Sequence, residues 1–366
     1  MAIYIHQLKY WPSFTWNEQE FISLLSEVRH LQGKLMGKVE GLGFELKDEA
    51  NLQTLIQDVL QTSAIEGEIL NPELVRSSIA TRLGLEYSGI ETSDRHVDGI
   101  VELMLDATQN DNKILTDDRL FGWHAALFPT GRSGLYKIEV ANWRSGAMQV
   151  VSGGIGREIV HYEAPRSENL AFEMKQFLDW FNSEQNLESV LKAAVAHLWF
   201  ITIHPFDDGN GRIARAITDM QLSKADGINQ RFYSMSTEIN KQKNGYYAIL
   251  ERTQKDDLEI TEWIIWFLGC LKNSILHSSI IIDKVVNKHN FWVKSAGLIN
   301  NERQKLMLNK LMENFEGNLT SSKWAKMTKT SPDTALRDIT DLVNKGILLK
   351  GEAGGRSTNY VLNYTF

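Results

Sequence analysis

The stretch HPFDDGNGRIAR, from His204 to Arg215, places one histidine, two adjacent aspartates, a Gly-Asn-Gly run and two arginines side by side in the chain. An apolar segment with helical periodicity, ESVLKAAVAHLWFITI, leads into it, and ARAITDMQLSKADG continues as a helix that ends near Gly227. Helix-period patterns also dominate most of the remaining chain. The sequence therefore predicts a mainly α-helical fold in which this stretch is the turn between two helices.

Composition limits the class of protein to which the chain can belong. Its 366 residues suffice for two or three domains, and 43% of them are hydrophobic. A single cysteine, Cys270, excludes an intrachain disulfide framework and a multi-cysteine zinc site. No apolar run approaches the roughly 18 residues that cross a bilayer, and the N-terminus lacks a signal-peptide pattern. We therefore expect a cytoplasmic protein with no membrane partner, and the net charge of −7 argues against a chain that coats nucleic acid.

The glycines and arginines of the stretch indicate a site for phosphates. Gly209, Asn210 and Gly211 can adopt positive φ angles, which turn backbone N–H groups toward one point. At the start of a helix such a nest binds anions, because the unpaired N–H groups and the helix dipole favour negative charge. Arg212 and Arg215 can project along the same face and pair bidentately with phosphate oxygens. Two such guanidiniums suit a polyphosphate better than a single phosphate.

The remaining polar residues predict a reaction on that polyphosphate. A carboxylate beside the nest, Asp208, would repel phosphate unless a divalent cation such as Mg²⁺ lies between them. His204 could take a proton from an incoming hydroxyl near neutral pH. Together these groups fit in-line attack of a hydroxyl on a metal-bound nucleoside triphosphate, and the sequence has no P-loop motif. Taken singly, a histidine is more often structural and an Asp-Gly-Asn-Gly run is more often a turn. The complete pattern is too long to arise readily by chance.

HPFDDGNGRIAR resembles the H-P-F-x-[D/E]-G-N-G-R-x-x-R signature of the Fic family at every fixed position. The resemblance implies a helical core with a β-hairpin flap over the site, and transfer of AMP from ATP to a protein hydroxyl with release of pyrophosphate. It implies that His204 is the general base and Asp208 the Mg²⁺ ligand. It further implies an ATP site that includes Asp207 and Asp208, with Gly209, Asn210 and Gly211 at the α- and β-phosphates and Arg212 and Arg215 at the terminal phosphates.

Two further segments resemble parts of this family. The Gly-rich stretch GGIG…IVHYEAP lies between short alternating runs that predict a β-hairpin, the only sheet expected before the C-terminal module. It resembles the family flap, on which a target segment docks by strand addition, and implies that Val160, His161 and Tyr162 lie near the nucleotide. Tyr246 and Tyr247 resemble a tyrosine pair near the adenosine, although both could simply pack a helix. Some relatives carry Asn where this chain has Gln254, which leaves that contact open.

TSAIEGE, before the core, contains a candidate inhibitory residue. Three helices are predicted in the N-terminal region. The first begins near Asn17, the second has Asp48 and Glu49 in its first turn, and the third starts at Asn71 with Pro72 at its first helical position. Glu66 falls at the end of the second helix, where the dipole disfavours negative charge, and gains by finding a cation. The pattern Thr62-x-x-x-Glu66-Gly67 resembles the inhibitory motif of autoinhibited Fic proteins, which implies a pair with Arg215. The alternative is an exposed glutamate at a helix end.

These patterns predict three domains. Residues 1–94 would form an N-terminal helical domain with the inhibitory helix, residues 95–285 the Fic core, and residues 296–366 a winged helix-turn-helix. The last module has three predicted helices, two strands, and 10 Lys and Arg against 7 Asp and Glu from Asn301 onward. Its candidate recognition helix carries Asp333, Asp338 and Asp341, which would oppose contact with DNA phosphates. We therefore favour a protein-docking or dimer-supporting role for this module over DNA binding.

Three functions remain open at this stage. The favoured one is a Mg²⁺-dependent, autoinhibited protein adenylyltransferase that acts on a Ser, Thr or Tyr hydroxyl of a target protein docked on the flap, and also on itself. A second is removal of AMP from a modified protein, with Glu66 positioning water. A third is a DNA-bound regulator that senses a nucleotide, against which the intact His204 and Asp208 argue because a sensor needs no base. The target and the oligomeric state are not encoded in any recognisable motif.

Overall fold

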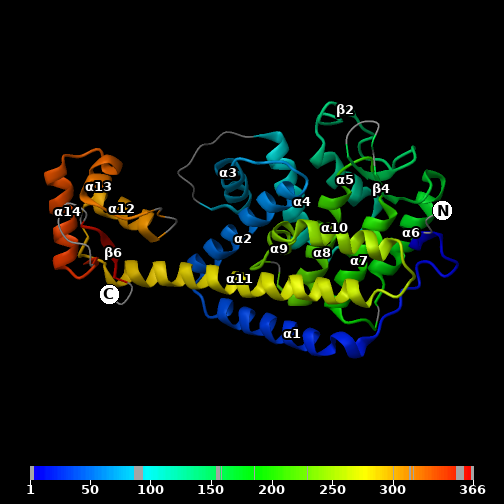
Figure 1. The fold of residues 1–366 in the computed structure, drawn as a ribbon, viewed down its shortest axis with the longest axis horizontal. Helices are drawn as coiled ribbons and strands as arrows, with labels where there is room; N and C mark the ends of the chain where they lie inside the picture. Colours follow the sequence, from blue (N-terminus) through cyan, green and yellow to red (C-terminus); the bar gives the residue numbers. More distant parts are fainter. Residues whose placement is uncertain are drawn as a thin grey trace. The chain divides into compact units, whose positions relative to one another are not determined.

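The computed structural model describes residues 4–85, 94–153, 157, 159–184, 186–228, 230–299, 301–312, 315, 317–351 and 358–363. The chain divides into two compact units, Met1–Ile281 and Ile282–Phe366. The first unit therefore contains both the N-terminal region and the segment expected to form the core. Helices dominate the described residues, and the strands form short two-stranded antiparallel sheets (Figure 1). This confirms the prediction of a mainly α-helical fold.

The helices that begin in the first unit follow the predicted order with additions. They are α1 (Glu18–Glu40), α2 (Phe44–Ile65), α3 (Pro72–Leu83), α4 (Arg95–Gln109), α5 (Asp117–Leu127), α6 (Leu170–Asn182), α7 (Ser189–Ile203), α8 (Asn210–Asp226), α9 (Met235–Lys241), α10 (Lys243–Gln254) and α11 (Thr261–Lys294). Two short 3₁₀ helices, Ile5–Gln7 and Ser167–Asn169, complete the set. The sequence analysis did not anticipate α4, α5 or α9.

Side-chain caps fix the starts of the N-terminal helices. The Asn17 side chain accepts a hydrogen bond from the Gln19 N–H at the start of α1, and Asn71 does the same for Glu73 at the start of α3. α2 begins at Phe44, earlier than Asp48, so the first-turn position predicted for Asp48 and Glu49 is wrong. Its other end agrees with the prediction, because the helix stops at Ile65 and leaves Glu66 as its C-terminal cap.

The helices α7 and α8 form the centre of the first unit. Nearly every residue of α7 is buried, including apolar side chains on all of its faces, so it is surrounded by other elements. It packs on α8 and α6, while α4 and α5 pack on each other and both also contact α8. α2 packs against α9 and α3 (Figure 1). The central pair thus holds the turn that joins its two helices in a fixed position.

Two hairpins lie between α5 and α6. β3 (Gln149–Ser152) pairs antiparallel with β4 (Ile159–Glu163), with an irregularity in register between Val150 and Val151. This is the predicted flap, although residues 154–156 of its expected GGIG turn lie outside the described residues. β1 (Arg132–Ser133) and β2 (Tyr136–Lys137) form a second hairpin, so the expectation of a single sheet before the C-terminal module is wrong.

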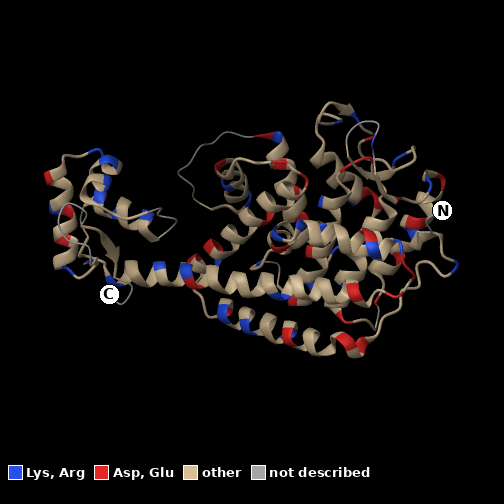
Figure 2. Ribbon diagram, in the orientation of Figure 1, with Lys and Arg blue, Asp and Glu red and all other residues tan. Residues whose placement is uncertain are grey.

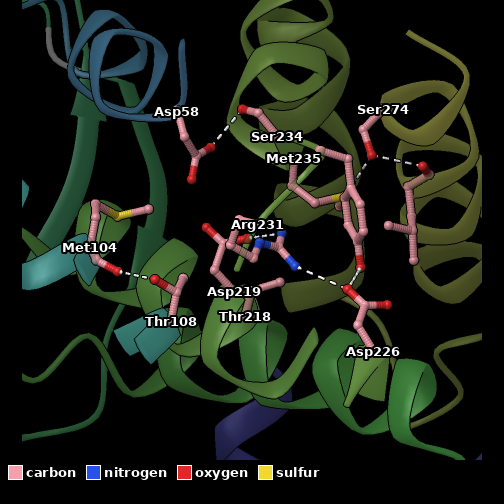
Figure 3. Close-up of polar contacts among 12 residues, drawn as sticks. Asp58, Met104, Thr108, Thr218, Asp219, Asp226, Arg231, Ser234, Met235 and Ser274 are labelled. Carbon is pink, nitrogen blue, oxygen red and sulfur yellow. Dashed lines mark hydrogen bonds and ion pairs between the residues drawn. The ribbon is translucent and has the colours of Figure 1, made fainter. Parts of the chain in front are cut away.

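A buried polar network joins α2, α8 and the segment before α9 (Figure 3). Arg231 donates to Asp219 Oδ1 at 2.6 Å and lies 3.6 Å from a carboxylate oxygen of Asp226. The Ser234 hydroxyl donates to Asp58 Oδ1 on α2 at 2.6 Å. Burial, and then the neighbouring Asp58, raise the pKa of Asp219 well above its ordinary value. One guanidinium therefore compensates several buried carboxyl groups.

We expect Arg231→Met to destabilise the first unit strongly. Removing the one cation leaves Asp219 and Asp226 buried without compensation, which costs about 3–5 kcal/mol. Asp219→Asn keeps an oxygen for Arg231 and is expected to cost less than about 1.5 kcal/mol. Chemical denaturation followed by circular dichroism compares the two variants. Equal losses from both would contradict this account of the network.

α11 (Thr261–Lys294) is the one described helix that is long and apolar enough to span a membrane by length and composition, which the sequence analysis did not foresee. Its first half packs inside the first unit, where four of its apolar side chains are buried: Trp263, Ile264, Phe267 and Leu268. The Trp263 indole also donates to the Ala194 carbonyl oxygen of α7 at 2.9 Å. These contacts are those of a core helix.

The second unit contains the predicted three helices and two strands. They are α12 (Glu302–Met312), α13 (Ser321–Thr328), α14 (Pro332–Asn344), β5 (Leu348–Lys350) and β6 (Tyr360–Leu362). Both signs of charge are distributed over these helices (Figure 2). Two acids of α14 do not oppose phosphate from an outward face, since Asp338 is buried against Arg303 at 2.8 Å and Asp341 pairs with Lys345 at 2.6 Å. Most of the expected wing, including Arg356, lies outside the described residues.

Candidate active site

The HPFDDGNGRIAR stretch forms the turn from α7 to α8, and two left-handed residues shape it. His204 caps α7 with φ 51° and ψ 60°, and Gly209 caps α8 with φ 81°. A side chain at Gly209 would also collide with the Phe128 ring, so both the positive φ angle and the lack of space favour glycine there. Asn210 and Gly211 are already helical, so the expected run of three positive φ angles is reduced to one. The N–H groups that face an anion are therefore those of the first turn of α8.

A cavity of about 660 Å³ opens at this turn. Of the predicted site residues, its lining includes Glu66, His161, Tyr162, His204, Asp207, Asp208, Asn210, Gly211, Arg215, Tyr246 and Tyr247. Three predicted site residues, Val160, Gly209 and Arg212, do not line it. Residues from the N-terminal region, the flap, the α7–α8 turn and α10 thus meet at one cavity, which is large enough for a nucleotide.

The His204 ring has a defined tautomer and is held neutral. Its Nδ1 lies 3.1 Å from the Ile201 carbonyl oxygen, which can only accept, so the proton is on Nδ1 and Nε2 is free. Burial lowers the pKa of His204 to about 4, although the carboxylates of Glu66 and Asp208 act in the opposite direction. An unprotonated Nε2 at the cavity wall can accept a proton from a hydroxyl.

The two aspartates occupy different environments. Asp207 Oδ2 accepts a hydrogen bond from the Glu139 N–H at 2.9 Å. Asp208 Oδ1 accepts from the Gly209 N–H at 2.6 Å, and its Oδ2 accepts from the Ser133 hydroxyl of β1. Ser133 was missed by the sequence analysis, because nothing in a two-residue strand signals which loop it meets.

A Mg²⁺ ion fits this donor set only together with a substrate. Within the described ranges no group of three or more His, Cys, Asp or Glu side chains could hold a metal ion. Mg²⁺ in nucleotide sites is commonly held by one or two carboxylates, phosphate oxygens and water. Asp208, beside the first turn of α8, supplies the single carboxylate that this arrangement requires, so the residues present are compatible with the ion.

Glu66 lies over the phosphate-facing end of α8. Its Oε1 accepts from Arg215 Nη2 at 2.7 Å, and Arg215 also donates to the Thr62 hydroxyl at 2.7 Å and to the Thr62 carbonyl oxygen at 2.9 Å. The Arg215 side chain is 1% exposed. A methyl group added at Gly211 would collide with Glu66 Oε1, so the carboxylate sits directly on the helix N-terminus. Burial alone would lower the pKa of Arg215, but the Glu66 carboxylate outweighs it and the pKa is raised.

Arg212 departs from the expected position. Instead of lining the cavity it lies 3.3 Å from Glu68 Oε2 and stacks over the Phe128 ring. The other oxygen of Glu68 pairs with His96 of α4, and this hydrogen bond raises the pKa of His96. Glu68 was missed, although it stands two residues after Glu66 in TSAIEGE. Each arginine of the motif is therefore paired with a glutamate from the same short segment.

The predicted flap residues have different surroundings, and the register irregularity of the hairpin falls between Val160 and Tyr162, at His161. His161 and Tyr162 line the cavity, whereas Val160 is 38% exposed and does not line it. His161 Nδ1 lies 2.7 Å from Glu251 Oε2 of α10, which connects the flap to that helix. Tyr162 is buried and donates to the Thr202 carbonyl oxygen at 2.7 Å.

Both tyrosines of the predicted pair line the cavity, and one of them also packs in the core. Tyr246 is buried, and its hydroxyl lies 2.8 Å from His197 Nε2, so it packs in the core while lining the cavity. Tyr247 is 41% exposed and also lines the cavity. Gln254 lines it as well, and its amide donates to the Thr202 hydroxyl at 3.2 Å.

Comparison with known families identifies two regions of the chain. Residues 114–222 match the Fic/DOC family, and residues 4–85 match a domain of unknown function, DUF4172. The Fic/DOC match contains the flap, α7, the turn at His204 and most of α8. It therefore includes most of the residues that line the cavity, whereas Glu66 and the lining residues of α10 lie outside it.

Curated relatives with the name protein adenylyltransferase Fic match more than half of the chain. The relative from Culex quinquefasciatus is 24% identical over 231 residues, which are 61% of this chain and 41% of that protein. The relative from Drosophila grimshawi is 28% identical over 217 residues, which are 57% of this chain and 40% of that protein. The chain thus spans about two fifths of the length of these relatives.

Solved structures share the fold. A Fic family protein from Desulfovibrio desulfuricans superposes with a TM-score of 0.53 at 18% identity, covering 97% of this chain and 98% of that one. A Fic-domain signaling protein from Bacteroides thetaiotaomicron gives a TM-score of 0.53 at 19% identity, covering 71% of this chain and 96% of that one. The likeness to the first of these extends over both compact units.

Proposed function

We propose that the chain, whose residues 114–222 match the Fic/DOC family, is a protein adenylyltransferase, which moves AMP from ATP to a protein hydroxyl. One observation carries the proposal. A single cavity of about 660 Å³ brings together a neutral histidine, a carboxylate, the N-terminus of α8 and a buried arginine. A nucleotide-sensing regulator would need the anion site but not the base, so His204 favours the enzyme.

In the proposed reaction the acceptor hydroxyl oxygen attacks the α-phosphorus of ATP. A new oxygen–phosphorus bond forms, the bond between the α-phosphorus and the bridging oxygen to the β-phosphate breaks, and pyrophosphate leaves. His204 Nε2 takes the hydroxyl proton while Nδ1–H stays on the Ile201 carbonyl oxygen. The first-turn N–H groups of α8 and Arg215 hold the phosphates. Mg²⁺ held by Asp208 would neutralise phosphate charge when it is bound.

The acceptor protein docks on the flap in this proposal. Val151, Ile159 and Val160 of β3 and β4 are between 38% and 61% exposed, so the hairpin offers apolar side chains and backbone groups to an added strand. A second copy of this chain could present the same kind of segment, which makes self-modification a convenient assay. We place both the reaction and its target in the cytoplasm.

The resting enzyme is autoinhibited in this proposal. Glu66 occupies Arg215 and covers the N-terminus of α8, where the terminal phosphates of ATP would have to lie. Glu68 in turn occupies Arg212. The Glu66 carboxylate therefore stands where the terminal phosphates would lie, and ATP can bind productively only when it leaves.

Removal of AMP from a modified protein is the second candidate. It is favoured by the position of Glu66, whose carboxylate lines the same cavity as His204 and could orient a water molecule. This reaction needs no terminal phosphates, so the pairs with Arg212 and Arg215 would not block it. Release of free AMP from a pre-modified protein by the wild type, without added ATP, would identify it.

The position of the radiolabel tests the main proposal. The purified full chain is incubated with Mg²⁺ and ATP labelled at either the α- or the γ-phosphorus, and protein-bound label is measured. We expect label only from the α position, weak in the wild type and stronger when Glu66 is replaced. Label from the γ position would indicate phosphorylation. Absence of label from all variants, despite measurable ATP binding, would reject the transferase.

A further inference from the structure

Arg144, which precedes the flap, holds three separate carbonyl oxygens. Its Nε donates to His204 O at 2.8 Å, its Nη1 to Gly146 O at 2.7 Å and its Nη2 to Pro165 O at 2.5 Å. Its own backbone N–H donates to Pro205 O at 2.9 Å. Gly146 lies just before β3 and Pro165 just after β4, so one guanidinium contacts both ends of the flap and the turn that carries His204.

Burying the Arg144 guanidinium costs hydration free energy, and its hydrogen-bond partners are neutral carbonyl oxygens. It is 2% exposed, and within the described residues no carboxylate forms an ion pair with it. Burial lowers its pKa, while the Tyr162 hydroxyl and the Asp207 carboxylate act in the opposite direction without outweighing it. Arg231, by contrast, is paired directly with Asp219 and Asp226. A buried guanidinium without a directly paired carboxylate is expensive to keep, so its position calls for a functional reason.

We propose that Arg144 is a positioning residue for the transfer reaction, which fixes the His204 turn and both ends of the acceptor-binding flap at one point. The proposal rests on the transferase function proposed above. The left-handed backbone of His204 is intrinsically unfavourable for a non-glycine residue and needs outside support, which the bond to its carbonyl oxygen supplies. Because the flap holds the acceptor and His204 takes its proton, a shared anchor sets the distance between the hydroxyl and Nε2.

The charge of Arg144 has a second effect on the same ring. Burial is the largest cause of the low pKa of His204, and the nearby Arg144 guanidinium lowers it further. Glu66 and Asp208 raise it, and they are the acidic groups that face the ring from α2 and from the turn itself. Removing the positive charge should therefore move the His204 pKa upward, toward its ordinary value.

The test uses the full chain in the Glu66→Gly background, with Arg144→Gln and Arg144→Lys as variants. Arg166→Gln, at an exposed arginine beside the same end of the flap, is the matched control. We expect Arg144→Gln to lower the maximal transfer rate about 10–100-fold, since small displacements of reacting groups have effects of this size. The KM for ATP should change less than about threefold, because α8 and Arg215 hold the phosphates. Arg144→Lys should restore part of the rate, and Arg166→Gln should have no effect.

A second readout does not depend on activity. The ring resonance of His204, assigned by its loss in His204→Ala, is titrated by NMR in each folded variant. We expect it to titrate at higher pH in Arg144→Gln than in the parent, with Arg144→Lys close to the parent because the charge is kept. A folded Arg144→Gln protein with an unchanged His204 titration and an unchanged transfer rate would overturn the proposal. If the parent itself transfers no label, the transferase function fails, and the titration still decides whether Arg144 acts on His204.

Discussion

His204→Ala, introduced with Glu66→Gly, is expected to lose about 10²–10⁴-fold in the rate of AMP transfer, the range for removal of a general base. The loss follows from the free Nε2 at the cavity wall, which no other described imidazole lining the cavity can replace, since both nitrogens of His161 are taken up by Ser152 and Glu251. The measurement is the initial rate of incorporation of α-labelled AMP at saturating ATP.

Binding should survive this substitution. The phosphates contact α8 and Arg215 in our proposal, so the affinity for ATP should stay within a small factor of the parent. His30→Ala, at an exposed histidine of α1, is the matched control and should leave transfer unchanged. A His204→Ala protein that binds ATP and still transfers AMP at the parental rate would show that His204 is not the general base.

The low pKa of His204 also predicts how the transfer rate depends on pH. Burial lowers the pKa of His204 to about 4, so the ring stays neutral and able to accept a proton from alkaline pH down to acidic pH. The rate should therefore not fall between pH 8 and pH 6 on account of this group, whereas a histidine with the ordinary pKa near 6.5 would lose about three quarters of its neutral form over that range. A rate profile with an acid limb near pH 6.5 in the parent would contradict the low pKa.

The sequence predicted the features that depend on residues close together in the chain. The caps at Asn17 and Asn71, the end of α2 at Glu66 and the end of α8 near Gly227 follow from side-chain chemistry within a few residues. The turn between α7 and α8 was predictable for the same reason. The start of α2 was not, because Gly43 and Phe44 give only a weak signal for a helix N-terminus.

Contacts between distant segments could not be predicted from local patterns, and only the family resemblance implied the Glu66–Arg215 pair. Arg212 and Arg215 stand three apart and share a pattern, yet one faces the cavity and the other meets Glu68 and Phe128. Which carboxylate an arginine meets depends on how α2 lies on α8, and periodicity does not encode that. The hydroxyl of Ser133 reaches Asp208 for a similar reason, through a hairpin of two-residue strands that no alternation pattern reveals.

Glu66→Gly is expected to raise AMP transfer about tenfold to a hundredfold, which corresponds to roughly 1.4–2.8 kcal/mol in the population of the productive ATP complex. The Glu66–Arg215 pair is short, at 2.7 Å, and Arg215 is 1% exposed, so solvent reaches the pair only from the Glu66 side, which is 30% exposed. Removing the carboxylate frees Arg215 and uncovers the N-terminus of α8 for phosphate. Parallel assays of label incorporation in the wild type, Glu66→Gly and Glu66→Gln measure the effect.

Glu68→Gln distinguishes the inhibitory effect of Glu68 from that of Glu66. Its contact with Arg212 is longer, at 3.3 Å, and the Glu68 side chain is 35% exposed, so we expect at most a tenfold rise from this change alone. If ATP needs both arginines at once, the double variant Glu66→Gly/Glu68→Gln should exceed the product of the single effects, because each remaining glutamate still withholds one arginine from the phosphates. A double variant no more active than Glu66→Gly would show that only the Glu66 pair restrains the enzyme. A Glu66→Gly protein as inactive as the wild type, with ATP bound, would exclude inhibition by Glu66 alone.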